Sequence, residues 1–434
     1  MDINRRTAYA VLLDMETNHS YSNLALNNFI GENQPDSPAF VRELVYGVTG
    51  NRILLDYYLS AQIPSGLGRV KKQDLTLLRM GLYQMLFMDS VPAYAAVSET
   101  VNLARRFCRG REGFINGVLR SFQRRLQQDG SQGLPQLPDR DKEPERYFSV
   151  KYSAALWLVE LWLESYGLAE TERLLAASGE RPVLSLRVNL KKTGRQELMG
   201  LLRQDGFEVE AGSLSDRVIL VKGKGTGILD HHLYKEGWFS VQDQASVAAA
   251  DMVHPLPGNL VADVCAAPGG KTLAMAEAME DTGEVYAFDI YEYKLKLIQA
   301  QAERLGLQSI RTGRQDARQV FEPLREKADC VLADVPCSGL GVIRRKPEIK
   351  LKDADQMDFE ELVHRQEEIL HAASAYVKQG GILVYSTCTI NPSENERQIH
   401  RFLERHREFS LAEMRQLLPE WENDGFYICK LLRG

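Results

Sequence analysis

The sequence has few cysteines, and their arrangement is typical of neither a metal site nor a disulfide framework. Six cysteines occur in 434 residues. None of them forms a C-x-x-C pair, so we expect no zinc site. Sparse cysteines in a chain without an export signal also argue against disulfides. We therefore expect reduced thiols, some of which could take part in chemistry: Cys108, Cys265, Cys330, Cys337, Cys388 and Cys429.

Long apolar runs are also lacking. No run reaches the roughly 18 residues that a membrane-spanning helix needs. Residues 1–6 contain no apolar signal segment, so we expect a cytoplasmic protein without a membrane partner. The net charge of −6 argues against a protein that coats nucleic acid indiscriminately. It still permits local basic faces.

One stretch of the chain is strongly basic. Seven arginines and a single acid, Glu112, lie between positions 105 and 125. Such an excess can contact phosphates, and a solvated helix face explains it equally well. The arginines are Arg105, Arg106, Arg109, Arg111, Arg120, Arg124 and Arg125.

The N-terminal part is predicted to be all-helical. Over residues 1–128 the apolar residues recur at helical spacing and strand signals are nearly absent, which favours a helical bundle. Residues 129–145 are rich in glycine, proline and charge, and we expect a linker there. Residues 146–250 mix helical and alternating patterns, which indicates a small α+β module.

From residue 251 to residue 434, predicted strands and helices alternate. This order indicates an α/β domain with a parallel sheet and helices on both faces. The expected strands lie near 260–264, 284–289, 309–313, 329–334 and 381–387, and the expected helices near 272–280, 292–305, 358–378 and 394–405.

A glycine turn follows the first of these strands. Gly269 and Gly270 allow a ligand to approach the backbone, and the helix that begins there offers free N–H groups. Asp289 ends the next strand, 19 residues after Gly270, which suits the hydroxyls of a ribose. Further acids that end or follow strands are expected at the same edge of the sheet: Asp263, Asp316 and Asp334.

The ligand is expected to be S-adenosylmethionine. A phosphate-binding P-loop needs a glycine five positions before Gly270, where Cys265 stands. The dinucleotide pattern G-x-G-x-x-G is absent as well. Crowded acids would repel a polyphosphate, whereas they favour a cationic sulfonium and amino group.

Two cysteines are predicted to share the edge of the sheet with these acids. Cys337 follows the fourth strand and Cys388 ends the fifth. A buried cysteine is usually an inert small hydrophobe, but its position beside a methyl donor favours a chemical role. Spacing alone leaves open which thiol would attack a substrate. It also leaves open whether Lys271 approaches the substrate or the cofactor.

The motifs resemble those of the RsmB (Sun/Fmu) group of RNA cytosine-C5 methyltransferases, and the first 128 residues resemble the NusB family of RNA-binding helical domains. The first resemblance rests on residues 263–272, 334–339, 386–388, 187–189, 242–246 and 345–348. The second rests on residues 40–48, 78–84 and 113–120. Together the two resemblances cover nearly the whole chain and imply a Rossmann-like methyltransferase domain.

The resemblance also implies roles for individual residues. Cys388 would be the nucleophile and Cys337 would help release the product, while Asp334 would serve both catalysis and cofactor binding. The target would be 16S rRNA, bound by a monomer without a metal. The cofactor contacts would be Cys265, Ala266, Ala267, Pro268, Gly269, Gly270, Lys271, Asp289, Asp316 and Asp334.

Cytosine chemistry gives a reason for a thiolate. C5 of cytosine is not nucleophilic, but a thiolate that adds at C6 makes C5 enamine-like, and a carboxyl group acting at N3 assists the addition. Ser393 and Glu396 form a capping-box pattern before the last predicted helix, whose positive end would favour a thiolate at Cys388.

Two other functions remain open from the sequence. One is a non-catalytic RNA-binding assembly factor, and the other is a methyltransferase for tRNA or another RNA. Basic residues outside the helical part could contact RNA or could be ordinary exposed charges. They are Lys222, Lys224, Arg344, Arg345 and Lys346.

Overall fold

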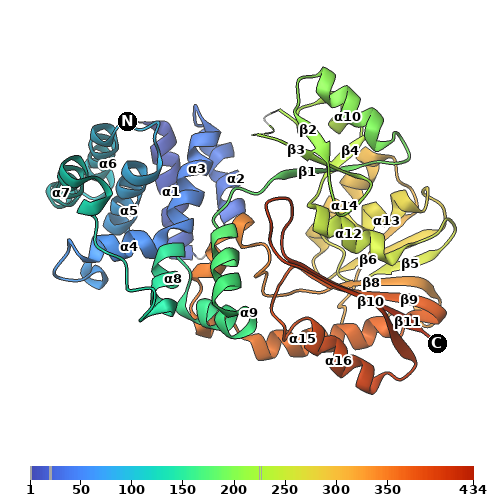
Figure 1. Cartoon of the computed structure of the whole chain (residues 1–434). Coiled ribbons are helices and arrows are strands. Elements are labelled where there is room, and N and C mark those ends of the chain that lie inside the picture. The colour runs from blue at the N-terminus through green and yellow to red at the C-terminus, as the bar shows by residue number, and fades with distance from the viewer. Residues whose placement is uncertain (1, 19–21, 224, 226) are drawn as a thin grey trace. The chain divides into compact units, whose positions relative to one another are not determined.

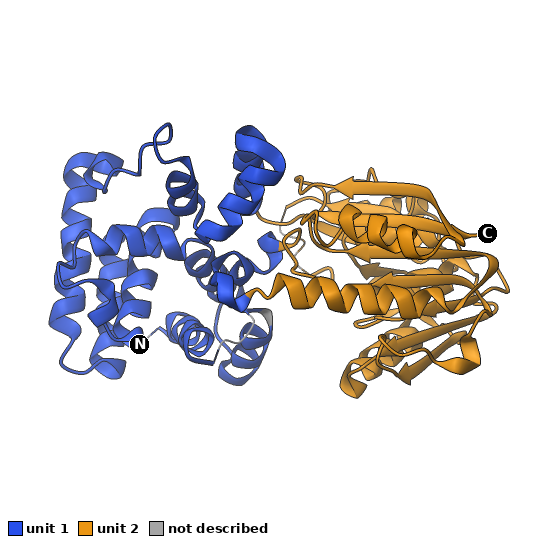
Figure 2. Ribbon diagram, turned by 90° about the horizontal axis from the view of Figure 1, so that it is seen from below, with its two compact units in different colours: residues 1–179, 343–356 blue, residues 180–342, 357–434 orange. Residues whose placement is uncertain are grey.

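The computed structural model describes residues 2–18, 22–223, 225 and 227–434. The chain forms two compact units, coloured separately in Figure 2, that interleave in the sequence. Unit 1 contains Met1–Gly179 and Ile343–Gln356, and unit 2 contains Glu180–Val342 and Met357–Gly434. Lys224 lies outside the described residues, so its predicted RNA contact has no structural counterpart.

Unit 1 begins with the helical bundle that the sequence predicts (Figure 1). Residues 74–84 of α5 are all buried, so this helix runs through the centre of the bundle core. The helices are α1 Ile3–Asn18, α2 Ser22–Asn33, α3 Pro38–Gly50, α4 Arg52–Ser60, α5 Lys72–Phe87, α6 Ala93–Phe107 and α7 Glu112–Asp129, with short 3₁₀ turns at Leu67–Arg69 and Gly130–Gly133.

The segment after α7 lies along the bundle. The Tyr57 hydroxyl donates to the carbonyl of Gln136 at 2.6 Å, and Leu134 and Leu137 pack against the bundle core. Two further helices, α8 Pro144–Tyr152 and α9 Leu156–Ala177, also belong to unit 1. Their place in unit 1 divides the range 146–250 between the two units, because their apolar faces are buried there.

A short excursion from the second unit completes unit 1. Residues 343–356 form three 3₁₀ turns, Ile343–Arg345, Pro347–Leu351 and Ala354–Gln356. The Glu348 carboxylate accepts hydrogen bonds from the N–H of Ser22 at 3.3 Å and from its hydroxyl at 2.9 Å. The buried ammonium of Lys350 donates to the carbonyl of Tyr152 at 2.7 Å.

Unit 2 contains a small antiparallel sheet with the order β2-β3-β1-β4. Its strands are β1 Leu184–Val188, β2 Val209–Ala211, β3 Val218–Val221 and β4 Phe239–Val241, and its helices are α10 Arg195–Gln204 and α11 His232–Lys235. The alternating patterns predicted the first three strands but not β4, which is only three residues long. Helix α12, Gln244–Val253, leads into the larger sheet.

The larger sheet has seven strands in the order β10-β11-β9-β8-β5-β6-β7. Counted from β5, the order is 3-2-1-4-5-7-6, which places a topological switch between β5 and β8. The strands are β5 Leu260–Asp263, β6 Glu284–Asp289, β7 Ile310–Arg314, β8 Ala328–Asp334, β9 Val377–Thr387, β10 Phe409–Leu417 and β11 Phe426–Arg433.

The expectation of a wholly parallel sheet is wrong. Strands β5 to β9 pair in parallel, but β11 pairs antiparallel with β9 and with β10. The sequence did not predict β10 or β11. Along β10 only Phe409 is buried, so this edge strand lacks the apolar signal of a core strand.

Helices cover both faces of the sheet, as predicted. Along β5, Val261 faces a cluster with α12 and α13, while Ala262 faces a cluster with α15 and α16. The helices are α13 Gly270–Ala278, α14 Glu292–Leu305, α15 Phe359–Ser374 and α16 Glu396–Arg405, with a 3₁₀ turn at Glu322–Leu324. No helix in the described part of the chain is apolar over a length that could cross a membrane.

Candidate active site

The residues predicted for the site meet at the carboxyl ends of the parallel strands. Asp263, Asp289 and Asp334 are the last residues of β5, β6 and β8, and Asp316 and Cys388 follow β7 and β9. Because β5 lies between β6 and β8, the predicted cofactor acids and the predicted cysteines occupy neighbouring positions. A crevice at such a switch point is the usual ligand site of open α/β sheets.

The glycine turn after β5 is held between its two neighbouring strands. The N–H of Val264 donates to the carbonyl of Leu332 at 3.0 Å, and that of Ala266 donates to the carbonyl of Phe288 at 2.8 Å. Gly269 has φ of 106°, and a Cβ there would lie 3.0 Å from Cγ1 of Ile298. Glycine is therefore required where the chain turns into α13.

Asp263 contributes a buried carboxyl with one free acceptor. Its Oδ2 accepts a hydrogen bond from the Thr272 hydroxyl at 2.6 Å, whereas Oδ1 is buried and has no hydrogen-bond partner among the described residues. Burial raises the pKa of Asp263 to about 7, although the bond from Thr272 acts in the opposite direction. A backbone hydrogen bond from Cys265 also lowers this pKa, so the carboxyl is held within the turn that follows β5.

The four predicted acids act together on one thiol. Burial, followed by the charges of Asp263, Asp334, Asp289 and Asp316, raises the pKa of Cys265 well above its ordinary value. Cys265 therefore remains a protonated thiol, and it packs against the hydrophobic cluster that lies between the sheet and α15. The concentration of carboxylates favours a cationic ligand at this position.

Two of these acids have partners that the sequence did not suggest. One oxygen of Asp289 accepts from the N–H of Tyr291 at 2.9 Å. Both oxygens of Asp316 accept from the guanidinium of Arg318, the shortest bond being 2.7 Å, and this pairing lowers the pKa of Asp316. Any adenine amino group bound by Asp316 would share the carboxylate with Arg318.

Lys271 and Asp334 form an ion pair beside the thiols. Nζ of Lys271 lies 2.7 Å from Oδ2 of Asp334, whose Oδ1 accepts from the Ser386 hydroxyl at 2.7 Å. Burial would lower the pKa of Lys271, but the charge of Asp334 and its hydrogen bond, followed by Cys388 and Asp263, more than offset burial and raise it. An ammonium group thus lies where it favours a thiolate at Cys388.

The two predicted cysteines are in contact. Sγ of Cys337 lies 3.3 Å from Sγ of Cys388. The hydrogen bond with Cys388 raises the pKa of Cys337 far above its ordinary value, and burial and the charges of Cys388 and Glu394 raise it further. The two thiols therefore influence each other's ionisation.

A buried ion pair anchors the glycine turn to the small sheet. Nε and Nη2 of Arg187 donate to the Glu277 carboxylate at 2.9 and 2.8 Å, and Nη1 donates to the carbonyl of Gly270 at 2.7 Å. Nη1 also donates to Gln242. Arg187 and Gln242 belong to motifs that were noted in the sequence, but only the structure assigns them this contact.

One expectation about neighbouring residues is not met, and the candidate RNA contacts differ in their exposure. The capping box of Ser393 and Glu396 is wrong, because α16 begins at Glu396 and its N-cap is Asn395. Among the candidate RNA contacts, Arg344 is only 8% exposed. Lys222 is exposed but lies 2.6 Å from the Glu210 carboxylate.

The arginine-rich stretch forms an exposed basic surface on unit 1. These arginines lie on α6, on α7 and in the turn between the two helices. Six of the seven side chains are exposed, and Arg111, which pairs with Asp74 at 3.0 Å, is half-buried.

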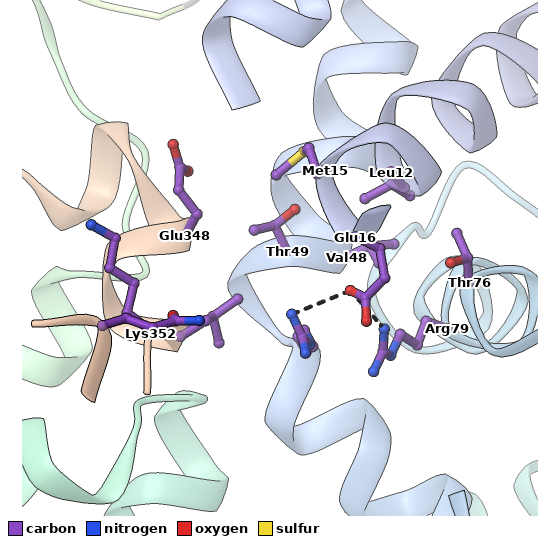
Figure 3. A pocket seen from close by; sticks show the side chains of 12 residues that line it. Leu12, Met15, Glu16, Val48, Thr49, Thr76, Arg79, Glu348 and Lys352 are labelled. Atoms are coloured by element: carbon purple, nitrogen blue, oxygen red, sulfur yellow. Dashed lines mark hydrogen bonds and ion pairs between the residues drawn. The ribbon is translucent and has the colours of Figure 1, made fainter. Parts of the chain in front are cut away.

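A separate cavity of about 370 Å³ lies within unit 1 (Figure 3). One of its carboxylates pairs with both of its arginines, since Glu16 lies 3.3 Å from Arg52 and 3.5 Å from Arg79. Glu348 and Lys352 also line it, but no residue of the predicted site does. The residues predicted for the site therefore lie at the edge of the sheet and not in this cavity.

The fold and the site define a Rossmann-like methyltransferase that carries a NusB-type helical domain. A family model described as "16S rRNA methyltransferase RsmB/F" matches residues 250–432. Models of the NusB family and of a ferredoxin-like domain of RsmF/B-like methyltransferases match residues 2–124 and 155–226.

Full-length relatives support the same assignment. The chain is 38% identical to the Bacillus subtilis "Probable ribosomal RNA small subunit methyltransferase B", with 98% of each chain covered. It is 35% identical to the Vibrio cholerae "Ribosomal RNA small subunit methyltransferase B", with 99% of this chain and 97% of that one covered. The crystal structure of PH0851 superposes with a TM-score of 0.80 at 25% identity over 98% of both chains. This chain belongs to the RsmB/F family of methyltransferases.

Proposed function

We propose that this protein transfers a methyl group from S-adenosylmethionine to C5 of a cytosine in 16S rRNA. In this proposal Cys388 is the nucleophile and Cys337 assists release of the product. The observation that carries the proposal is the pair of thiols, 3.3 Å apart, beside the ion pair of Lys271 and Asp334. The names of the full-length relatives support a small-subunit rRNA substrate.

S-adenosylmethionine would supply an activated methyl group when bound. The residues that would hold it are the turn from Cys265 to Lys271 with Asp289, Asp316 and Asp334. The four carboxylates around Cys265 support this choice, because the cofactor is cationic at its sulfonium and amino group.

The thiols would divide the reaction into covalent steps. The Cys388 thiolate, favoured by the Lys271 ammonium, adds to C6, and its electron pair makes C5 nucleophilic. The Asp334 carboxyl group, in its protonated form, gives a proton to N3 as the thiolate adds, and takes it back when Cys388 leaves. After C5 has gained the methyl group and passed its proton to a solvent water, the bond between C6 and Cys388 breaks, and the proton on Cys337 passes to the departing Cys388 sulfur.

The parts of the chain would have separate tasks. Residues 1–128 would bind RNA through their exposed arginines. Residues 129–145 would connect them to α8 and α9, residues 180–250 would form the small module of unit 2, and residues 251–434 would carry catalysis. A monomer in the cytoplasm, without a metal, completes the proposal.

The deciding experiment supplies the protein with labelled S-adenosylmethionine and either 16S rRNA or tRNA, and then maps the modified base. We expect label at C5 of one cytosine in 16S rRNA. Label in tRNA alone would replace the proposed substrate. RNA binding without any transfer would favour the non-catalytic assembly factor.

A further inference from the structure

A buried carboxylate lies directly behind the two thiols. Glu394 is fully buried in the short segment between β9 and α16. Neither the sequence motifs nor the proposed reaction gives this residue a role. A buried carboxylate is costly unless hydrogen bonds compensate for the lost water, so its partners indicate why it is there.

Both oxygens of Glu394 accept several hydrogen bonds. Oε1 accepts from the Ser338 hydroxyl at 2.5 Å and from Nδ2 of Asn391 at 3.0 Å. Oε2 accepts from the N–H of Ser338 at 2.9 Å and from Nε2 of Gln366 at 2.9 Å. Hydrogen bonds to an ionised acceptor are the stronger kind and impose a defined geometry on their donors.

These donors come from both cysteine loops. Ser338 directly follows Cys337, and its hydroxyl lies 2.7 Å from that of Thr389, which directly follows Cys388. Thr389 also lies 3.5 Å from Oε1 of Glu394. The residue after each thiol is therefore held by one carboxylate.

Further bonds connect the carboxylate to the surrounding frame. Nε2 of Gln366 on α15 also donates to the carbonyl of Pro336, at 3.0 Å. The hydroxyl of Tyr385 on β9 donates to the carbonyl of Glu394 at 2.7 Å. Because these contacts reach β9, α15 and the loop after β8, a displacement of Glu394 would change the relative position of the two thiols.

We propose that Glu394 is a positioning residue that holds the Cys337 and Cys388 loops at the spacing at which both thiols reach the same cytosine. The inference rests on the proposed function, and it assigns the task of alignment to a residue that touches neither cofactor nor substrate. The negative charge of Glu394 has a second effect, because it contributes to the raised pKa of Cys337 and so helps keep the proton there.

Two conservative variants separate the effect of side-chain length from the effect of negative charge. Glu394→Gln keeps the length of the side chain, but its amide N–H groups would face donors on one side. Glu394→Asp keeps the charge but withdraws it by one methylene. The matched control is Glu396→Gln, at a half-buried position two residues further along the chain.

We expect both variants to lower kcat by about 10- to 100-fold while KM for S-adenosylmethionine and for RNA changes little, because small misplacements of reacting groups have effects of this size. Without RNA, alkylation of Cys337 by iodoacetamide should begin about one pH unit lower in Glu394→Gln than in the wild type, because a neighbouring negative charge has been removed. Glu394→Asp should keep the wild-type alkylation profile. Glu396→Gln should match the wild type in every measurement.

Wild-type kcat in either folded variant would overturn the proposal. An equal loss of cofactor affinity in calorimetry would also overturn it, since the whole edge of the sheet would then have collapsed. If Glu394→Gln does not fold, Glu394→Asp decides the outcome through its kcat. Failure of the proposed function itself is distinguishable, because Cys388→Ala would then retain transfer in a chain with an intact Glu394.

Discussion

Buried charged groups have different roles in the helical bundle and at the edge of the larger sheet. In the bundle, Arg79 is 5% exposed and donates to both oxygens of Asp56, at 2.7 Å each. At the edge of the sheet, Asp263 is equally buried, yet its Oδ1 has no partner among the described residues. Sγ of Cys337 and Sγ of Cys388 lie 3.3 Å apart at the same edge of the sheet.

The difference shows how to distinguish a framework from a site. A buried ion pair whose hydrogen bonds are all made contributes a defined geometry, and removing one partner costs stability. A buried group with an open acceptor or a shared proton is a candidate for binding or chemistry. Substitutions at the edge of the sheet should therefore mainly lower activity. Substitutions in a buried ion pair whose hydrogen bonds are all made should mainly lower stability.

The largest effect is expected for Cys388→Ala. Without the nucleophile, transfer of labelled methyl to 16S rRNA should fall by about 1000-fold or more, while the unfolding midpoint stays close to that of the wild type. Cys108→Ala, at a buried cysteine of the bundle, is the matched control and should retain turnover. Retained transfer in Cys388→Ala would reverse the assignment of the two cysteines.

Cys337→Ala should stop the reaction at a later step. If its proton assists release, the bond between Cys388 and C6 should persist, and a denaturation-resistant protein–RNA band should accumulate. The double variant with Cys388→Ala should show no such band. A single variant without the band would remove the proposed release role of Cys337.

Arg187→Met tests the buried ion pair of Arg187 and Glu277, in which Arg187 also donates to the glycine turn that is proposed to bind the cofactor. The substitution leaves the Glu277 carboxylate buried without its partner, so we expect a loss of about 3–5 kcal/mol in the free energy of unfolding. Affinity for S-adenosylmethionine should also fall, because the carbonyl of Gly270 loses its donor. Adding Glu277→Leu should restore most of the stability but not the affinity. Unchanged stability in the single variant would show that the ion pair of Arg187 and Glu277 does not form in solution.

Asp289→Ala should weaken cofactor binding, measured by calorimetry, by about tenfold or more, as expected for the loss of a hydrogen bond to a charged group. Asp316→Ala should have a smaller effect, because Arg318 already occupies both oxygens of that carboxylate. The reverse order of the two effects would contradict the proposed ribose contact of Asp289.

Lys350→Met should remove a pH dependence from unit 1. Burial lowers the pKa of Lys350 from 10.5 to about 8, so between these values the unfolded chain binds a proton that the folded chain does not. The wild type should therefore gain stability relative to Lys350→Met as pH rises above 8, by about 2 kcal/mol at pH 9.5. Below pH 8 the difference should be constant. Hydrogen exchange in α8 and α9 measures the difference in stability above and below pH 8. A stability difference that stays constant up to pH 9.5 would show that the ammonium is not buried.

Several features of the fold were predictable because they rest on local patterns. Alternating strands and helices predicted β5 to β9, and the glycine turn with Asp289 at its usual distance predicted a nucleoside-type ligand. β10 and β11 were not predictable, since their pairing with β9 is antiparallel and β10 is mostly exposed. The membership of residues 343–356 in unit 1 was hidden as well, because contacts such as that of Glu348 with Ser22 join residues far apart in the sequence.

By itself, the sequence determined the kind of site: a glycine turn, acids at strand ends and two cysteines at the same edge of a sheet. Residue types at short spacing carry that information, because period and turn chemistry act locally. Only the tertiary structure decided that Lys271 pairs with Asp334, that the two thiols lie 3.3 Å apart and that Glu394 lies close enough to raise the pKa of Cys337. These properties depend on burial and on charges brought together from β5, β8, β9 and the Glu394 segment, and no single stretch of sequence contains them.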